Sequence, residues 1–333
     1  MMEDLEMMVK GAKNALGTIL NMQPNEPILV ITDEGSLPIA EAFSTGGTEL
    51  EGQVKMYQLP EDKRPFQELP EDLPEYLNHC REGGIIINLI QANSAETPFR
   101  IKLIKSELQT KARVGHAPGI TINMMTEGPM SADYVKIAEK VSYLMDQFKN
   151  AKKVNITAPG GTDIELYIEN RKFETDVEIK QGTMGNLPAG EIWCAPEEDK
   201  ANGLIVCDGS IGDVGNVISP LKIEVREGKI VALESESQDL VDEVKELTSV
   251  DEMAAIVGEL GIGLNPRARL TGNMLEDEKA GKTAHIAFGN NDTMPSGKNT
   301  SSTHRDFLFY NPTFMVEYQD GSSKMIISKG EVI

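Results

Sequence analysis

The sequence predicts an α/β protein that combines an N-terminal open α/β sheet domain with a C-terminal, mostly antiparallel, β-rich α+β domain. In residues 1–150, short apolar runs alternate with stretches of helical spacing, which is typical of a sheet flanked by helices. In residues 151–333, short strands separated by turn signals dominate. A chain of 333 residues is long enough for two such domains, with a boundary near residue 150.

The elements of the first domain follow from their apolar patterns. Residues 27–33 and 84–90 are continuous apolar runs, as expected of buried parallel strands. Residues 38–43 are expected to be helical. Ser131 is placed to cap a further helix, in which the apolar side chains between residues 134 and 148 keep helical spacing and are expected to pack in the core.

The second domain contains two predicted hairpins. Glu227-Gly228 separates the runs 221–225 and 229–233, and Asp320-Gly321 separates 314–318 from 324–328. A short turn with glycine between two apolar runs of equal length is the usual signature of two antiparallel strands.

One helix is expected to interrupt these strands. Ser249 and Glu252 have the spacing of a capping box and would begin a helix over residues 253–259. Glu259 would then lie at the helix C-terminus, where the helix dipole disfavours a carboxylate. Such a position requires a compensating cation, either a nearby Lys or Arg or a metal ion.

Composition excludes several classes of partner. The chain is 40% hydrophobic and has no run of eighteen apolar residues, and its acidic start lacks the basic region of a signal peptide. Cys80, Cys194 and Cys207 form no CxxC pair, so we expect reduced thiols and a cytoplasmic location. A net charge of −21 makes nucleic acid an improbable partner, and no membrane association is expected.

Two of the four histidines indicate a metal site. His285 and His304 both lie in predicted strands, and alternation places Asp306 on the same face as His304. A single strand histidine is usually a partly buried residue satisfied by backbone, but two imidazoles with a carboxylate form a typical site for a first-row metal. We interpret His79 as a surface helix residue and His116 as a loop residue that lines a cleft.

Other catalytic patterns are weak or absent. Glu191 follows a Pro/Gly turn and enters an apolar strand beside the only tryptophan, where a lone carboxylate is usually a solvated strand end. The sequence contains no G-x-S-x-G elbow, P-loop or dinucleotide fingerprint. A cysteine nucleophile would need a histidine partner that nothing in the sequence indicates.

Taken in order, several segments resemble the thermophilic metallo-aminopeptidase family of leucyl aminopeptidase T and its relatives. These segments are residues 186–191, 259–263, 271–289 and 299–306. Residues 160–163 also resemble the Gly-Thr-Asp element of that family. The likeness is specific between about residues 155 and 310 and looser in the N-terminal domain, whose α/β pattern fits the family.

The resemblance implies a dinuclear exopeptidase whose metals are held by two Glu, two His, one Asp and one Tyr. By motif, the carried-over ligands are Glu191, Glu259, His285, His304 and Asp306. Glu191 and Glu259 are also the expected catalytic carboxylates. One or two ions of Zn, Co or Mn would suit these donors, lower the pKa of a bridging water and polarise the scissile carbonyl.

The chain departs from the family at the tyrosine. Residues 289–292 stand where that tyrosine is expected, so Asp292 either replaces it as an oxygen ligand or leaves the second metal weak or absent. The chain is also shorter than those peptidases, so substrate-side insertions are expected to be missing.

Two other functions stay open. Dioxygenases of the 2,5-dihydroxypyridine type are similar to short members of the same superfamily, and in that case His285, His304 and Asp306 would bind a single Fe(II). A non-catalytic metal-binding relative is the third possibility. We expect a site on the second domain near the domain cleft, a peptide or small-molecule substrate and, from the resemblance, a homodimer.

Overall fold

The computed structural model describes residues 2–333, which form two compact units. Unit 1 contains the segment ending at Ala138 together with Asp176–Ala189, and unit 2 contains Glu139–Thr175 and Gly190–Ile333. This division differs from the single boundary expected near residue 150. The physical reason is that β8 (Met184–Asn186) pairs in parallel with β4 (Arg113–His116), a long-range pairing that local composition does not reveal.

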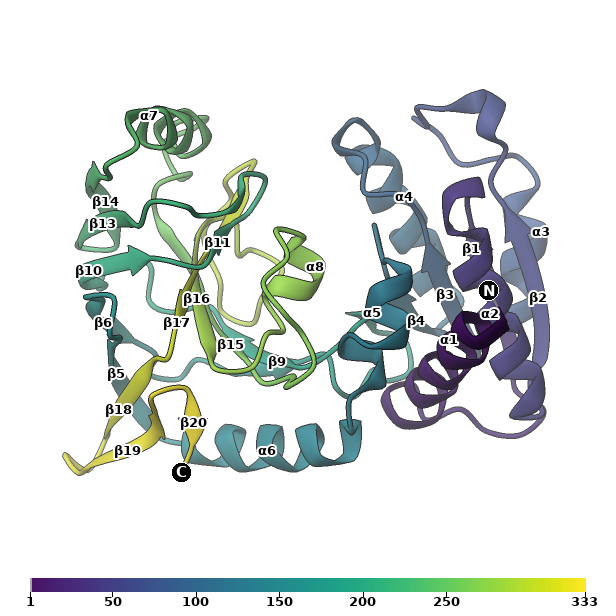
Figure 1. Ribbon diagram of the computed structural model, residues 1–333, viewed down its shortest axis with the longest axis horizontal. Coiled ribbons are helices and arrows are strands. Elements are labelled where there is room, and N and C mark those ends of the chain that lie inside the picture. Colours follow the sequence, from purple (N-terminus) through teal and green to yellow (C-terminus); the bar gives the residue numbers. More distant parts are fainter. Residues whose placement is uncertain (1) are drawn as a thin grey trace. The chain divides into compact units, whose positions relative to one another are not determined.

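Unit 1 is built on a five-stranded sheet in the order β2-β1-β3-β4-β8, in which every pairing is parallel (Figure 1). Its other strands are β1 (Pro27–Thr32), β2 (Gln53–Gln58) and β3 (Ile85–Leu89). The two apolar runs are β1 and β3, and their almost complete burial confirms the predicted parallel strands.

Helices cover both faces of this sheet. Leu29 and Ile31 belong to a core cluster with Phe99 of α4, whereas Ile28 contacts the position of Gly47 in α2 on the other face. The helices that begin in this unit are α1 (Met2–Asn14), α2 (Leu37–Glu49), α3 (Leu73–Leu77), α4 (Thr97–Leu108), α5 (Ile122–Thr126) and α6 (Tyr134–Gln147). Single helical turns occur at Ala15–Ile19, Glu34–Ser36, Glu61–Lys63, Asn78–Cys80, Ser94–Glu96 and Pro129–Ser131.

The helix predicted over residues 38–43 is confirmed by α2, but the predicted cap of α6 is wrong. The hydroxyl of Ser131 donates to the carbonyl of Gly128 at 2.7 Å, and the carboxylate of Asp133 accepts from the backbone N–H of Lys136 at 3.2 Å. Asp133 therefore caps the first turn. Among residues 2–333, no helix has the length and apolarity that crossing a membrane would require.

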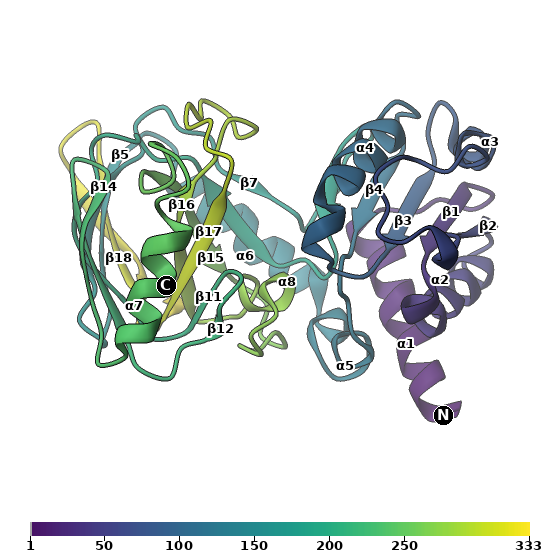
Figure 2. The ribbon, with the colours of Figure 1, turned by 90° about the horizontal axis from the view of Figure 1, so that it is seen from above.

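Unit 2 contains two antiparallel sheets, which lie as two layers in Figures 1 and 2. The eight-stranded sheet has the order β14-β13-β10-β6-β5-β18-β19-β20, and the seven-stranded sheet has the order β12-β11-β17-β16-β15-β9-β7. The first comprises β5 (Ala151–Thr157), β6 (Asp163–Tyr167), β10 (Asn202–Cys207), β13 (Leu221–Arg226), β14 (Lys229–Glu234), β18 (Thr313–Tyr318), β19 (Ser323–Ser328) and β20 (Glu331–Val332). The second comprises β7 (Glu174–Thr175), β9 (Glu191–Cys194), β11 (Ser210–Ile211), β12 (Gly215–Asn216), β15 (Val257–Gly263), β16 (Thr283–Gly289) and β17 (His304–Tyr310).

Both predicted hairpins are confirmed, as β13 with β14 and β18 with β19. At the first turn, Glu227 and Gly228 have φ angles of 49° and 76°. Two consecutive residues with positive φ are what the tight turns of right-twisted hairpins require. Together with the parallel sheet of unit 1, the two antiparallel sheets confirm the predicted fold class.

The helix expected over residues 253–259 is wrong. A helix does occur earlier, as α7 (Gln238–Leu247), where the side chain of Ser237 accepts from Leu240 N–H. Residues 257–263 instead form β15, with every residue buried. Three glycines, at 258, 261 and 263, disfavour a helix, and pairing with β9 and β16 on either side outweighs the local capping signal. Glu259 is therefore a strand residue, and the argument from the helix dipole does not apply.

Candidate metal centre

One face of the seven-stranded sheet carries a cluster of acids and imidazoles. Ala287 in β16 pairs with Asp306 in β17 and with Glu259 in β15, so these residues form a row across three strands. His285 lies two residues before Ala287, and His304 lies two residues before Asp306. Because side chains two residues apart in a strand share a face, the cluster forms on one side of the sheet.

Glu191 lies on the same face in a fourth strand, β9. It pairs with Gly263 of β15, which shares the face of Glu259 and Gly261. Gly261 pairs with His285, and a Cβ at this glycine would overlap the imidazole ring. The absence of a side chain at this position is therefore what allows His285 to lie across β15.

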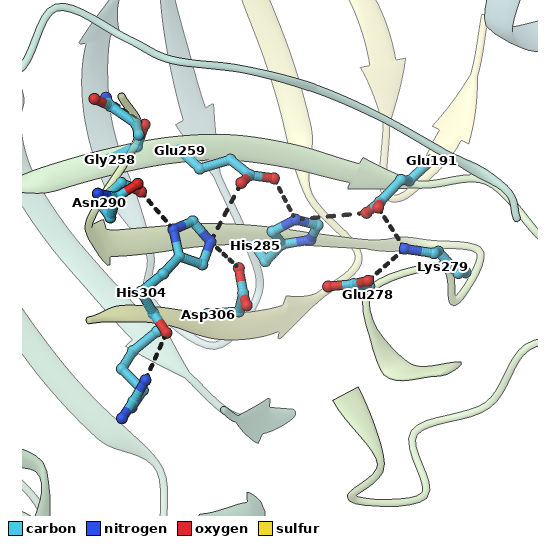
Figure 3. Close-up of polar contacts among 11 residues, drawn as sticks. Glu191, Gly258, Glu259, Glu278, Lys279, His285, Asn290, His304 and Asp306 are labelled. Carbon is cyan, nitrogen blue, oxygen red and sulfur yellow. Dashed lines mark hydrogen bonds and ion pairs between the residues drawn. The ribbon is translucent and has the colours of Figure 1, made fainter. Parts of the chain in front are cut away.

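The distances bring four of the predicted ligands together (Figure 3). His285 Nε2 lies 3.2 Å from Glu259 Oε1, and His304 Nε2 lies 3.3 Å from Glu259 Oε2 and 3.5 Å from Asp306 Oδ1. Ligand atoms of Glu259, His285 and Asp306 all lie within 4.8 Å of one another. Glu191 is farther out, with its Oε2 3.7 Å from His285 Nε2.

The orientation of His304 is fixed by the loop before β17. Its Nδ1 lies 2.7 Å from the carbonyl oxygen of Asn290, to which it donates. In the neutral ring, this hydrogen bond leaves the lone pair of Nε2 directed at Glu259 and Asp306. A backbone carbonyl that fixes the tautomer in this way is the usual outer partner of a metal-binding histidine.

The buried acids and imidazoles of the cluster shift the pKa values of one another. Burial alone would raise the pKa of Glu259, but hydrogen bonds from His285 and His304 outweigh it and lower that pKa. Burial alone would lower the pKa of both imidazoles, and the surrounding carboxylates raise it instead. Glu259 thus stays ionised near neutral pH, as a metal ligand must.

A buried lysine closes the other end of the cluster. Lys279 Nζ lies 2.5 Å from Glu191 Oε1 and also contacts a carboxylate oxygen of Glu278. Burial raises the pKa of Glu278; the ammonium of Lys279 opposes this effect and the charge of Asp306 adds to it. Acids and bases therefore alternate from Asp306 to Glu278, as Figure 3 shows.

The donor set fits a divalent first-row ion. Ligand atoms of Glu259, His285 and Asp306 lie within 4.8 Å of one another. Nε2 of the partly exposed His304 lies 3.3 Å from Glu259 and 3.5 Å from Asp306. This mixture of nitrogen and oxygen donors suits Zn, Co, Mn or Fe(II) rather than a soft thiolate site. Glu259, His285, His304 and Asp306 are the residues that would hold such an ion.

Other candidate residues lie elsewhere. Asp292 is exposed in the turn after β16 and is not among the clustered ligand atoms, so the structure does not bring it to the centre. His79 is half-buried in the turn after α3, with Nε2 2.6 Å from the carbonyl of Gln53. His116 is not a loop residue, because it ends β4, where it is buried beside Asn88.

The cysteines offer no alternative chemistry. Cys80, Cys194 and Cys207 are free, buried thiols, in agreement with the expectation of reduced cysteines. Burial raises the pKa of each of them, so none is a thiolate near neutral pH.

Sequence reasoning missed Glu278, Lys279 and Gly261. Glu278 and Lys279 stand in a run of charged residues, which usually indicates a solvated surface, so nothing local distinguishes a buried lysine there. The signal for Gly261 was present, because glycine within a strand often marks a close approach of another group.

The fold and the donor set together define a candidate site for a divalent cation on an antiparallel sheet. The model of the thermophilic metalloprotease family (M29) matches residues 121–332, and the chain belongs to this family.

Curated relatives are described as aminopeptidases. The chain is 25% identical to aminopeptidase AmpS of Bacillus subtilis (strain 168) over 168 residues, which are 44% of this chain and 40% of that protein. It is 27% identical to aminopeptidase T of Thermus thermophilus over 218 residues, 58% of this chain and 51% of the relative. The chain thus spans about half the length of the curated relatives it matches.

Two solved structures share the fold over nearly the whole chain. The structure of 2,5-dihydroxypyridine dioxygenase from Pseudomonas putida KT2440 matches with a TM-score of 0.74 and 16% identity, covering 98% of this chain and 96% of that one. Wild-type AmpT from Thermus thermophilus matches with a TM-score of 0.71 and 17% identity, covering 98% and 99%.

Proposed function

We propose that this protein is a metal-dependent aminopeptidase that hydrolyses the N-terminal residues of peptides. The observation that carries the proposal is the cluster of Glu259, His285 and Asp306 on one face of the sheet, with the Nε2 of His304 beside both carboxylates. Membership in the metalloprotease family and the aminopeptidase relatives support the same activity. Cytoplasmic location and a homodimer stay predictions.

The residues of the cluster would have separate roles in binding the metal ion and in positioning its neighbours. Glu259, His285, His304 and Asp306 are proposed to hold a divalent ion, which when bound would activate water and polarise the scissile carbonyl. The backbone carbonyl of Asn290 accepts a hydrogen bond from the Nδ1–H of His304, which leaves Nε2 available for binding. Glu191, the other proposed catalytic carboxylate, is held in place by Lys279 beside His285. The acidic surface would mildly favour the cationic amine of a peptide.

One alternative has a specific observation in its favour. His285, His304 and Asp306 are two imidazoles and one carboxylate, the donor set of mononuclear Fe(II) oxygenases. The family tyrosine is missing, and the exposed Asp292 does not replace it near the cluster. A ring-cleaving dioxygenase of the 2,5-dihydroxypyridine type is therefore the second candidate function.

One assay separates the two functions. Protein stripped with a chelator and reloaded with Zn, Co or Mn should release the chromophore from a leucyl or alanyl anilide without oxygen, because hydrolysis needs no redox change. N-acetylation of the substrate should abolish the reaction. If no unblocked anilide or peptide is cleaved, yet the Fe(II) protein consumes oxygen with a dihydroxypyridine, the aminopeptidase proposal is wrong.

A further inference from the structure

The ammonium group of Lys279 is held at a fixed place inside unit 2. The residue is 0% exposed. It lies in the turn after α8 (Met274–Asp277), where its backbone N–H and its backbone carbonyl both form hydrogen bonds. Its N–H donates to the carbonyl of Glu276 at 3.1 Å, and its carbonyl accepts from the N–H of Asn265 at 2.9 Å. The position of the charge therefore follows from the fold and not from a mobile surface side chain.

The carboxylates around this ammonium form a cation site that is already filled. Nζ lies 2.5 Å from Glu191 and contacts Glu278, and both carboxyl groups are largely buried. A metal ion bound to the same oxygen of Glu191 at an ordinary distance of about 2.1 Å would lie within about 5 Å of Nζ. Two positive groups at so short a distance in a buried site repel each other strongly. Glu191 is therefore a poor ligand for a second ion while Lys279 is charged.

The loop after β16 removes another ligand expected for a second metal. Asn291 is buried, and its side chain donates to the carbonyl of Gly258 at 2.9 Å while its backbone N–H donates to the carbonyl of Asn299. With Asn291 turned inward, the adjacent Asp292 is exposed. The position that corresponds to the family tyrosine therefore supplies no oxygen to the cluster.

We propose that Lys279 takes the place of the second metal ion, so that the protein binds a single divalent cation at Glu259, His285, His304 and Asp306. The proposal rests on the proposed metal-dependent function and deepens it. Lys279 is a positioning residue: its ammonium neutralises Glu191 and Glu278 whatever the metal supply and holds Glu191 with Oε2 3.7 Å from His285 Nε2.

Metal stoichiometry tests this proposal directly. Apo-protein is equilibrated with excess Mn²⁺, freed of unbound ion and measured by elemental analysis, with the electron paramagnetic resonance spectrum as a second readout. The wild type should hold about one ion per chain and give the signal of an isolated ion. Lys279→Met should hold about two, because the ammonium that competes with a metal ion for the oxygens of Glu191 and Glu278 is then removed. Lys282→Met is the matched control, since Lys282 is an exposed lysine of the same segment that pairs with Glu331.

Each outcome decides one statement. About two ions in the wild type, or about one in a folded Lys279→Met variant, would overturn the role of Lys279 and leave the proposed function intact. A wild type that binds no ion would overturn the proposed function as well. If Lys279→Met does not fold, the stoichiometry and the spin-coupling signal of the wild type still decide, because two coupled ions beside an intact Lys279 contradict the proposal.

Discussion

At the residue scale, Gly261 is the position on which the geometry of the centre depends most. A methyl group there would overlap the imidazole of His285, which is fully buried. Gly261→Ala should therefore displace the ring and lower the affinity for metal roughly 10- to 100-fold, as disturbing a metal shell typically does.

Titration of the apo-protein with Zn²⁺ measures this change. Gly17→Ala is the control, because a Cβ at Gly17 meets nothing within 4 Å. Unchanged affinity in a folded Gly261→Ala protein would show that His285 does not bind the metal in the position described.

The two aspartates of the C-terminal segment should behave differently. Asp306 lies in the cluster, so Asp306→Ala should remove bound metal and activity while the fold persists, and His304→Ala should do the same. Asp292 is exposed and is not among the clustered ligand atoms, so Asp292→Ala should leave the metal content unchanged. Elemental analysis of the three variants beside His79→Ala, a histidine outside the cluster, checks this contrast; metal loss in Asp292→Ala alone would contradict it.

Most residues of the proposed centre could be predicted from the sequence, but Lys279 could not. His304 and Asp306 could be paired because strand alternation is local, and His285 stood in an apolar run that reads as a strand. Glu191 and Glu259 were assigned as ligands through the family resemblance. The local pattern alone indicated a solvated strand end for Glu191 and, for Glu259, a helix end that does not form. The contact of Lys279 with Glu191 joins residues 88 apart in the chain, and no local pattern encodes it.

At the scale of elements, β15 shows how tertiary pairing overrides a local signal. Ser249 and Glu252 have the spacing of a capping box, yet residues 257–263 lie between β9 and β16 as a fully buried strand. Gly261, one of the three glycines that disfavour a helix in this segment, is also the residue that leaves room for His285. The hairpins were predictable because their turn residues and strands are adjacent in the sequence.

A buried polar chain links two strands and a helix of unit 1 and makes stability depend on pH. Asn88 of β3 donates to both oxygens of Glu107 in α4 and contacts the Nδ1 of His116 in β4. Burial raises the pKa of Glu107 from its ordinary 4.5 to about 8 and lowers that of His116 from 6.5 to about 3. Both groups are therefore neutral in the folded protein near pH 6.

The sign of each contribution follows from proton binding. Between about pH 4.5 and 8 the folded state keeps a proton on Glu107 that the unfolded state has lost, so this contribution to stability falls as pH rises through that window. Between about pH 6.5 and 3 the unfolded state binds a proton on His116 that the folded state does not, so stability falls as pH drops.

Glu107→Gln tests the first of these statements. The variant mimics the protonated carboxyl, so it should match the wild type near pH 5 and exceed its free energy of unfolding by about a few kcal/mol near pH 9. Urea denaturation at both pH values measures the difference, with Glu75→Gln as an exposed control in α3. Parallel pH profiles for Glu107→Gln and the wild type would mean that Glu107 is ionised in the folded protein.

At the scale of the whole molecule, every residue of the proposed centre belongs to unit 2. Composition predicted the change from a parallel to an antiparallel architecture, because strand patterns and turn signals change near residue 150. It did not predict that 176–189 returns to the sheet of unit 1, since the pairing of β8 with β4 spans about seventy residues of the chain.

The central claim is that one face of the seven-stranded sheet in unit 2 holds a divalent ion. Crystals of the full chain grown with Mn²⁺ or Zn²⁺, with diffraction recorded on either side of the absorption edge of the metal, test it most directly. We predict an anomalous peak bound by the Nε2 atoms of His285 and His304 and by the carboxylates of Glu259 and Asp306. A fully loaded crystal with no peak at these four side chains, or with its peak elsewhere on the chain, would contradict the account.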